Sequence, residues 1–290
     1  MVDVAGKSPT LRTAVATVEV RLAAATLERI IRRDLPKGDV LAAAQIAGIM
    51  AAKQTPHLLP LCHPLELTEV QVHCLPIPAL GRICIQTMAQ ALARTGAEME
   101  ALTAAGIAAL TVYDMCKGLG LGIEVTGLRL LQKTGGRSGR WRGAGVGQVV
   151  AVSVSAEKGT RKANVPEIEL EAGLGVKGDA HAGPGLRQVS LLAAESIGSA
   201  RARGVEVGPG DFAENITTEG LELHTLLVGT HLLLGHEAVG TVTQIGKECL
   251  TPCAIGRSLG ECVMPREGIF VSVLQSGKLR PGDLVQVLEP

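Results

Sequence analysis

The segment Lys133–Gly145 divides this chain of 290 residues into two parts with different patterns. It is rich in glycine and arginine and has no apolar periodicity, which is typical of a loop at a domain boundary. A single continuous core is therefore not expected. We predict one domain over residues 1–142 and a second over residues 146–290, each long enough to bury a core of its own.

The first part mixes strand-like alternation with helical periodicity, but strands and helices do not alternate one for one. That order favours an α+β domain in which helices cover one face of an antiparallel sheet. The expected strands are 11–22, 67–75, 82–88 and 123–131, and the expected helices are 24–33, 38–53 and 96–117.

The second part has shorter apolar runs and more glycine turns, which predicts a mostly-β barrel or sandwich. Only residues 192–203 have a convincing helical pattern. The expected strands are 148–155, 188–192, 215–218, 226–234, 239–245, 269–274 and 284–288.

Composition excludes several classes of protein. The four aromatic residues, Tyr113, Trp141, Phe212 and Phe270, cannot form a stacking platform for single-stranded nucleic acid, and the cores must be aliphatic. No apolar run is long enough for a membrane span. Seven cysteines, an odd number, and the absence of a signal-peptide pattern favour free thiols in the cytoplasm.

The net charge of zero conceals an asymmetry between the two parts. Residues 1–142 contain 16 Lys+Arg and 11 Asp+Glu, and the remainder contains 12 and 17. The basic residues of the first part are scattered rather than clustered. This distribution suits a small anionic ligand better than a nucleic-acid backbone.

The expected helix 96–117 carries titratable groups on an apolar surface. Asp114 and Lys117 are three residues apart and share a face. Glu100 lies 14 residues before Asp114, close to four whole turns, and so falls on roughly the same stripe. These residues could line an acid–base site, but taken alone Asp114 and Lys117 are equally consistent with a surface salt bridge.

Further segments set polar residues in apolar surroundings, and their order along the chain is informative. Together they resemble the cyclic pyranopterin monophosphate synthase family of molybdenum cofactor biosynthesis, nearly without gaps to about residue 139. The segments are Met1-Val-Asp-Val with Lys7 and Arg12, Lys37-Gly-Asp-Val, Ala47-Gly-Ile, Ala51-Ala-Lys53, Leu59-Pro-Leu-Cys-His-Pro-Leu65, Thr95-Gly-Ala-Glu-Met-Glu-Ala-Leu-Thr103, Tyr113-Asp-Met-Cys-Lys117 and Gly135-Gly-Arg-Ser-Gly139.

The resemblance implies a ferredoxin-like α+β domain that assembles as a hexamer of dimers. It implies a lyase that converts 3′,8-cyclised dihydroguanosine triphosphate into cyclic pyranopterin monophosphate and diphosphate, with no cofactor needed. It also implies functional links to a radical enzyme that supplies the substrate and to molybdopterin synthase.

By position, the resemblance assigns catalysis to Asp114 as the acid/base, with Lys117 and Lys37. The implied substrate-contacting residues are Leu61, Cys62, His63, Met99 and Glu100, and the implied triphosphate ligands are Lys7, Arg12, Lys53 and Arg137. Positioned cations can stabilise the charge that builds up as diphosphate leaves. The backbone amides of Gly135–Gly139 could cradle an oxyanion. No metal ligand is expected.

The second part contains Gly178-Asp-Ala-His-Ala-Gly183, Pro209-Gly-Asp-Phe-Ala-Glu-Asn-Ile216 and Cys262-Val-Met-Pro-Arg-Glu-Gly-Ile-Phe270. These motifs resemble the MOSC domain, a β-barrel. The resemblance implies binding of the molybdenum cofactor, molybdenum ion or pyridoxal phosphate, or transfer of sulfur through one cysteine, which we place at Cys253.

Two features of the second part bear on its chemistry. Leu250 stands where close relatives carry histidine, so proton handling there is open. Cys249, Cys253 and Cys262 lack the Cys-x₂-Cys spacing of a zinc knuckle, and zinc is not expected.

Two hypotheses follow. The chain is a bifunctional enzyme, or the first part is a non-catalytic oligomeric scaffold that presents the MOSC domain. Intact Lys37, Asp114 and Lys117 favour the enzyme, because a decayed site would lose them first.

Overall fold

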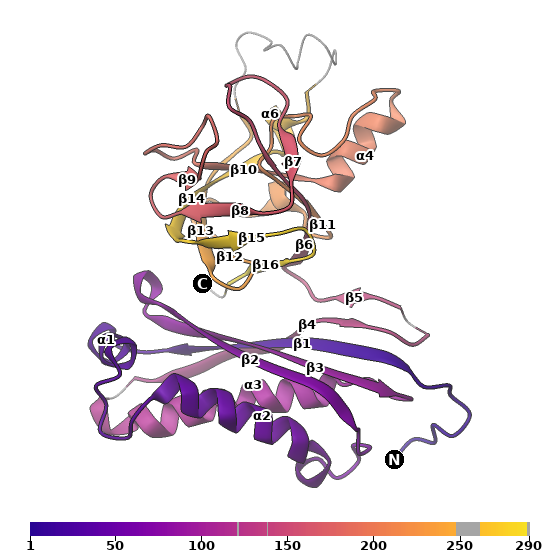
Figure 1. Ribbon diagram of the computed structural model, residues 1–290, viewed down its shortest axis with the longest axis vertical. Helices are drawn as coiled ribbons and strands as arrows, with labels where there is room; N and C mark the ends of the chain where they lie inside the picture. Colours follow the sequence, from indigo (N-terminus) through magenta and orange to yellow (C-terminus); the bar gives the residue numbers. More distant parts are fainter. Residues whose placement is uncertain (121, 138, 248–261, 289–290) are drawn as a thin grey trace. The chain divides into compact units, whose positions relative to one another are not determined.

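The computed structural model describes residues 1–120, 122–137, 139–247 and 262–288. It divides into two compact units, Met1–Gly143 and Ala144–Leu288 (Figure 1). No helix among the described residues is long and apolar enough to cross a membrane.

The first unit is an antiparallel sheet with its two long helices side by side on one face (Figure 1). The sheet order β2-β3-β1-β4, reached through β1-α-β2-β3-α3-β4, is the ferredoxin-like arrangement, so the α+β prediction is confirmed. The elements are β1 (Thr10–Arg21), α1 (Ala24–Arg32), α2 (Val40–Leu58), β2 (Leu67–Ile77), β3 (Arg82–Ala93), α3 (Glu98–Cys116) and β4 (Glu124–Thr134), with short 3₁₀ turns at Pro78–Leu80 and Lys117–Leu119.

The glycine-rich sequence around Trp141 predicts a linker, but in the structure Trp141 lies in a strand. It belongs to β5 (Trp141–Arg142), which pairs with β4 at the edge of the sheet, with Trp141 opposite Lys133. The turn between β4 and β5 is closed by glycines with positive φ, including Gly135 (95°) and Gly136 (73°). The local sequence indicates the turn, but it does not indicate that the chain forms a strand after the turn and pairs with β4.

Small residues bring α2 and α3 close together. The inward face of α3 is almost entirely alanine, and Gly48 of α2 lies against it. A Cβ on Gly48 would come within 3.0 Å of the Ala104 carbonyl oxygen and of Val72 Cγ2. Thr87 on β3 donates a 2.7 Å hydrogen bond to the Ala101 carbonyl, which fixes α3 on the sheet. This packing sets the positions of the helix ends, where the candidate site residues lie.

The second unit contains a closed barrel, as predicted. Its ring of strands runs β6-β11-β10-β14-β13-β12-β16 and returns to β6. The ring strands are β6 (Val146–Val154), β10 (Val189–Ala193), β11 (Ile216–Glu219), β12 (His231–Leu234), β13 (Ala238–Ile245), β14 (Ile269–Gln275) and β16 (Leu284–Val287).

Smaller elements surround the barrel. A short strand β7 pairs with β6, and β15, β8 and β9 form a separate three-stranded sheet. The bounds are β7 (Ala163–Val165), β8 (Ile168–Glu171), β9 (Gly175–Val176), α4 (Ala194–Ala202), a 3₁₀ turn at Leu223–Thr225, α6 (Met264–Glu267) and β15 (Gly277–Leu279).

The strand expected over 226–234 begins only at His231, so this prediction is wrong at its start. Leu227 and Val228 are apolar but exposed, and Gly229 has φ 95°. The apolar run 226–234 predicted a continuous strand, whereas the chain turns at Gly229 before the strand begins.

Candidate functional site

A cavity of about 580 Å³ opens in the first unit where three strand ends meet. At the start of β1, Thr10 lies opposite Ala93 at the end of β3, and Thr13 lies opposite Thr134 at the end of β4. The register therefore brings the residues that follow β3 and β4 next to the segment that precedes β1. A cavity of this size suits a small molecule.

The cavity is strongly basic. Glu98 is the one carboxylate among its described lining residues, and it forms a 2.9 Å ion pair with Lys133. The excess of positive charge predicts an anionic ligand. The lining cations are Lys7, Arg12, Arg94, Lys133 and Arg137.

A glycine turn forms one wall of this cavity. A Cβ on Gly135 would come within 2.1 Å of the Leu11 carbonyl oxygen, and one on Gly136 within 1.6 Å of the Arg12 guanidinium. Both glycines have positive φ, which favours glycine, and at Gly135 the Leu11 backbone is a second constraint that excludes a side chain. Arg12 also donates from Nε to the Ala93 carbonyl at 3.3 Å, which holds its guanidinium at the cavity.

A second cluster lies at the C-terminal end of α3. Asp114 accepts from Lys37 Nζ at 2.9 Å and pairs with Lys117 Nζ at 2.8 Å, and Lys37 also donates to the Asp114 carbonyl oxygen. Lys37 reaches this point because Gly38 (φ 87°) turns the chain and Asp39 caps α2 by accepting from the Ala42 amide.

The two ammonium groups determine the protonation of Asp114. Hydrogen bonds from Lys117 and then Lys37 lower the pKa of Asp114 to about 2, and Asp114 in turn raises the pKa of Lys117. The Asp114 carboxylate is therefore ionised at neutral pH, and Lys117 is charged. Asp114 is therefore a carboxylate that holds two lysine side chains in place.

A third group lies near the start of α3. The Cys62 thiol lies 3.6 Å from Glu100 Oε1, and Glu100 is only 1% exposed. Its other oxygen makes no hydrogen bond within the described residues. Burial raises the pKa of Glu100, and it also raises the pKa of Cys62, as does the nearby carboxylate. Met99 and Leu61 are exposed, and His63 is half-buried.

The predicted residues thus fall into separate groups within the chain. Asp114 lies 16 residues after Glu98, which places the two roughly 24 Å apart along α3. Glu100 and Asp114, predicted to share a stripe, lie at opposite ends, with Glu100 buried and Asp114 exposed. Lys53 is exposed on α2 and is not among the residues that line the cavity.

Two cavity residues, Arg94 and Lys133, were not predicted from the sequence. Residues 1–143 contain five lysines, and four of them were already site candidates. Lys133, the fifth, directly precedes the Thr134-Gly-Gly turn and lies at the end of β4. The position of Lys133 next to the glycine turn was visible in the sequence. Only the strand register shows that β3 and β4 end at the same place, beside the start of β1.

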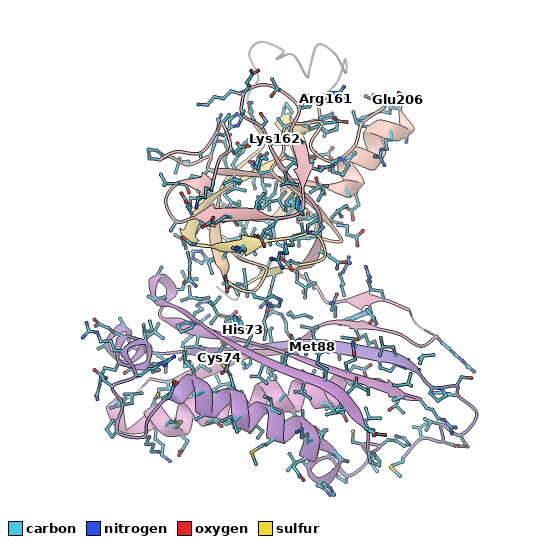
Figure 2. All side chains as sticks on the ribbon, viewed as in Figure 1. His73, Cys74, Met88, Arg161, Lys162 and Glu206 are labelled. Carbon is cyan, nitrogen blue, oxygen red and sulfur yellow. The ribbon has the colours of Figure 1, made fainter. Side chains whose placement is uncertain are left out.

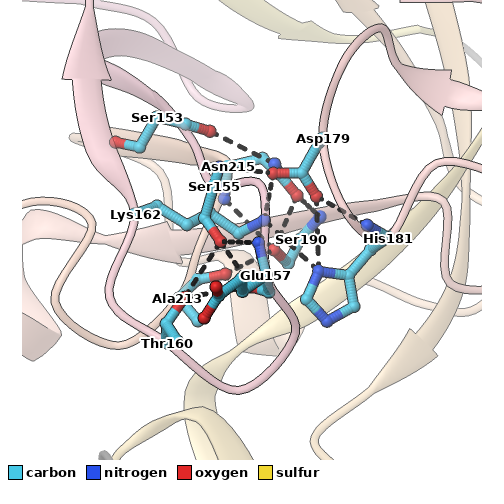
Figure 3. Close-up of polar contacts among 10 residues, drawn as sticks. All are labelled: Ser153, Ser155, Glu157, Thr160, Lys162, Asp179, His181, Ser190, Ala213 and Asn215. Atoms are coloured by element: carbon cyan, nitrogen blue, oxygen red, sulfur yellow. Dashed lines mark hydrogen bonds and ion pairs between the residues drawn. The ribbon is translucent and has the colours of Figure 1, made fainter.

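In the second unit, the motif around Gly178 builds a buried polar network (Figure 3). Asp179 forms an ion pair with Lys162, and both side chains are 1% exposed. Asp179 Oδ2 also accepts from the Ser155 amide at 3.0 Å, and Oδ1 accepts from the His181 amide at 3.0 Å. Burial would raise the pKa of Asp179, but hydrogen bonds from His181 and Lys162 hold it below its usual range.

A smaller cavity of about 150 Å³ lies beside this network. Its basic lining residues are His181, Arg187 and Lys247, and Cys262 also faces it. Cys262, Cys62 and Cys116 are free thiols; Cys116 is buried and Cys62 half-buried. Cys249, Leu250 and Cys253, to which the sequence assigns sulfur chemistry, lie outside the described residues.

The fold and cavities define a two-part protein: a ferredoxin-like unit with an anion-binding cavity, followed by a β-barrel unit with a smaller polar cavity. Comparisons with known proteins agree. The sequence profile of the MoaC family matches residues 1–136, and that of the MOSC domain matches residues 177–286.

The chain belongs to the MoaC family through its first unit and carries a MOSC domain in its second. The cyclic pyranopterin monophosphate synthase of Rhodospirillum rubrum is 57% identical over 141 residues, which are 49% of this chain and 85% of the relative. The enzyme of the same name from Nostoc sp. is 55% identical over 139 residues, 48% of this chain and 83% of the relative.

Solved structures similar to the chain match about half of it. The YUAD protein from Bacillus subtilis matches with a TM-score of 0.43 and 16% identity; the match covers 49% of this chain and 95% of the YUAD chain. YiiM from Geobacillus stearothermophilus matches with a TM-score of 0.39 and 21% identity; the match covers 49% of this chain and 75% of the YiiM chain.

Proposed function

We propose that the first unit is a cyclic pyranopterin monophosphate synthase, a lyase that converts the 3′,8-cyclised dihydroguanosine triphosphate and releases diphosphate. The observation that carries this proposal is the basic cavity at the three strand ends. It offers five cations and one carboxylate, together with a glycine turn against Arg12. A triphosphate requires such an arrangement, because its charge must be neutralised both on binding and as diphosphate leaves.

Proton transfer falls to the lysines in this proposal. Because the pKa of Asp114 is about 2, its carboxylate is a poor proton donor at neutral pH. We therefore assign Asp114 to holding Lys37 and Lys117 in place, with the ammonium groups as proton donors. This refines the role of catalytic acid/base that the sequence resemblance gave to Asp114.

The site requires two copies of the chain. The cavity and the Asp114 cluster lie roughly 24 Å apart along α3 in one subunit, too far for one small substrate to touch both. A second copy that brings its own Asp114 to the cavity completes the site. Exposed apolar side chains on the two helices, including Ile46, Met50, Leu110 and Tyr113, give such a copy a surface to pack on. We propose a homo-oligomer, of the hexamer type built from dimers.

The second unit is proposed to bind the molybdenum cofactor or to carry sulfur through Cys253. The residues of its described cavity fit part of this cofactor: His181, Arg187 and Lys247 offer hydrogen-bond donors to an anionic group such as a phosphate. The volume of about 150 Å³ suits the phosphate end of such a group rather than the whole of it. The pathway proposed for the chain joins it to a radical enzyme upstream and to molybdopterin synthase downstream.

The test supplies purified full-length protein with the cyclised triphosphate and measures diphosphate and the cyclic product. The parent protein is expected to turn over. Asp114→Asn and Lys37→Ala should each lose activity on the order of a hundredfold or more. Asp34→Asn is the matched control, because Asp34 is an exposed aspartate of the same unit that pairs with Arg29 at 3.0 Å.

Absence of turnover by folded parent protein would refute the proposal and favour the non-catalytic scaffold. Equal activity of Asp114→Asn and Asp34→Asn would refute the role given to Asp114. Oligomer size, measured on each variant, separates a lost site from a lost assembly.

A further inference from the structure

A third cavity, of about 530 Å³, lies in the second unit beside the first turn of α4 and shares no lining residue with the two cavities described above. Its walls come from the end of β10, the start of α4, the chain that follows β11 and the end of α6. Gly220 (φ 77°) turns the chain after β11, and its amide donates to Glu195 Oε1 at 2.8 Å. This hydrogen bond ties two walls of the cavity together.

The lining of this cavity is acidic. Three carboxylates, Glu195, Glu222 and Glu267, line it, and none of them forms an ion pair with a residue that the structure describes. The described lining contains no lysine or arginine, and His224 is the one group in it that can carry a positive charge. The two other cavities are basic, so the opposite sign here predicts a cationic ligand.

Ser196 gives an independent indication of a ligand. It lies in the first turn of α4 and lines the cavity, yet it is only 5% exposed. The hydroxyl of Ser199, on the same helix, donates to the Glu195 carbonyl at 3.0 Å, whereas that of Ser196 makes no hydrogen bond with any described residue. A polar group so nearly closed off from water normally has a partner. The Ser196 oxygen can accept from a donor inside the cavity.

The arrangement suits an organic cation better than a metal ion. Among the described residues, no three His, Cys, Asp or Glu side chains lie close enough together to hold a metal ion. The carboxylates come from three separate segments, and buried Ala193 and Leu221 add apolar surface to the same lining. A methylene chain with several ammonium groups matches both features, because its charges are spaced apart and its carbons pack on apolar surface. The volume is in the range of small-molecule sites.

We propose that this acidic cavity binds a linear polyamine. Glu195, Glu222 and Glu267 pair with its ammonium groups, and the Ser196 oxygen accepts a hydrogen bond from one of them. The ligand is recognised by the number and spacing of its charges. The inference goes beyond the proposed function of either unit, since it uses no residue of the synthase site or of the basic barrel cavity.

The test titrates the full-length protein by calorimetry with propylamine, putrescine and spermidine, which carry one, two and three ammonium groups. Salt at about 0.15 M screens exposed charges beyond about 8 Å, which weakens general attraction to acidic surface. Spermidine should saturate one site per chain. Affinity should rise about fivefold with each added ammonium group, because each one meets a further carboxylate.

Glu195→Gln and Glu222→Gln should each weaken spermidine binding about fivefold. In Glu195→Gln the amide oxygen can still accept from the Gly220 amide, so this variant removes the charge without releasing the turn. Ser196→Ala should also weaken binding about fivefold, since one ammonium loses its acceptor. Glu206→Gln is the matched control: Glu206 is an exposed glutamate just beyond the end of α4 and does not line the cavity (Figure 2). It should bind spermidine like the parent.

Hydrogen exchange locates the bound ligand, because spermidine should slow exchange in peptides that cover residues 194–200 and 220–224. The proposal is overturned if spermidine does not bind, if Glu206→Gln weakens binding as much as Glu195→Gln, or if propylamine binds as tightly as spermidine. Mg²⁺ that binds more tightly than spermidine and displaces it would also overturn it, because the cavity would then belong to a metal ion.

Discussion

The buried ion pair between Lys162 and Asp179 gives the sharpest prediction about stability. Both side chains are 1% exposed, so neither charge has water as an alternative partner. Asp179→Asn removes the negative charge and keeps only one of the two oxygens that accept from the Ser155 and His181 amides. The variant therefore leaves the Lys162 ammonium buried without its counter-charge.

The expected cost follows from that burial. Removing one member of a buried pair destabilises a protein by about 3–5 kcal/mol, because an uncompensated charge remains. Asn has a single oxygen, so the variant loses one of the two amide hydrogen bonds in addition to the charge. The double variant Lys162→Met/Asp179→Asn removes both charges and should recover the part of the loss that comes from the unpaired charge.

Hydrogen exchange of the full-length chain measures this effect, with peptides from β6 and β10 reporting the opening of the barrel. The control is Lys177→Met, which removes a lysine whose 3.0 Å partner Glu169 is exposed like itself. That variant should show little or no loss. If Asp179→Asn costs no more than Lys177→Met, or if the double variant gives no recovery, the reasoning is wrong.

Two further predictions concern packing and pH. Gly48→Ala should lower the free energy of unfolding of the first unit by about 1 kcal/mol, because the new Cβ meets the Ala104 carbonyl oxygen and Val72 at 3.0 Å. Gly106→Ala should raise it by up to about 1 kcal/mol, because alanine favours the helix and the nearest neighbour, Leu128, is 3.7 Å away. Urea unfolding followed through Trp141, the single tryptophan, measures both, and equal effects would contradict the packing. Since the folded-state pKa of Asp179 lies below its ordinary value, its contribution to stability is complete above about pH 4 and is lost as the pH falls further. The barrel of Asp179→Asn should therefore show a weaker loss of stability in acid than the parent, and an identical pH dependence would count against the pairing.

Much of the fold could be predicted from residue periodicity. The long helices and most strands contain enough turns or alternations to be recognised locally, and the middle of α3 is alanine-rich from Ala101 to Ala109. Interruptions were harder to predict. Leu227 and Val228 extend an apolar run but precede a glycine turn, and Trp141 sits in glycine-rich sequence yet pairs with β4. Trp141 pairs with Lys133 across a glycine turn, so the same glycines that indicate a loop instead allow a hairpin.

The candidate site, like the fold, was predictable in part from the sequence. Lys7, Arg12, Lys53 and Arg137 were predicted as one group, and three of them line one cavity, whereas Lys53 does not. Arg94 and Lys133 were missed because their positions follow from the register of β3 and β4 against β1. The separation of Asp114 from this cavity follows from the length of α3, but the sequence does not show that the cavity forms at the opposite end of that helix.

The most direct test of the central claim is subunit complementation. Asp114→Asn and Arg12→Gln chains are prepared separately, mixed in equal amounts under conditions that exchange subunits, and assayed for diphosphate release from the cyclised triphosphate. If each site takes Asp114 from one copy and Arg12 from another, random mixing leaves about one quarter of the sites intact. The mixture should then recover about one quarter of the parent activity, although each variant alone is inactive. A mixture that has exchanged subunits but remains as inactive as its components would contradict a synthase site shared between two copies.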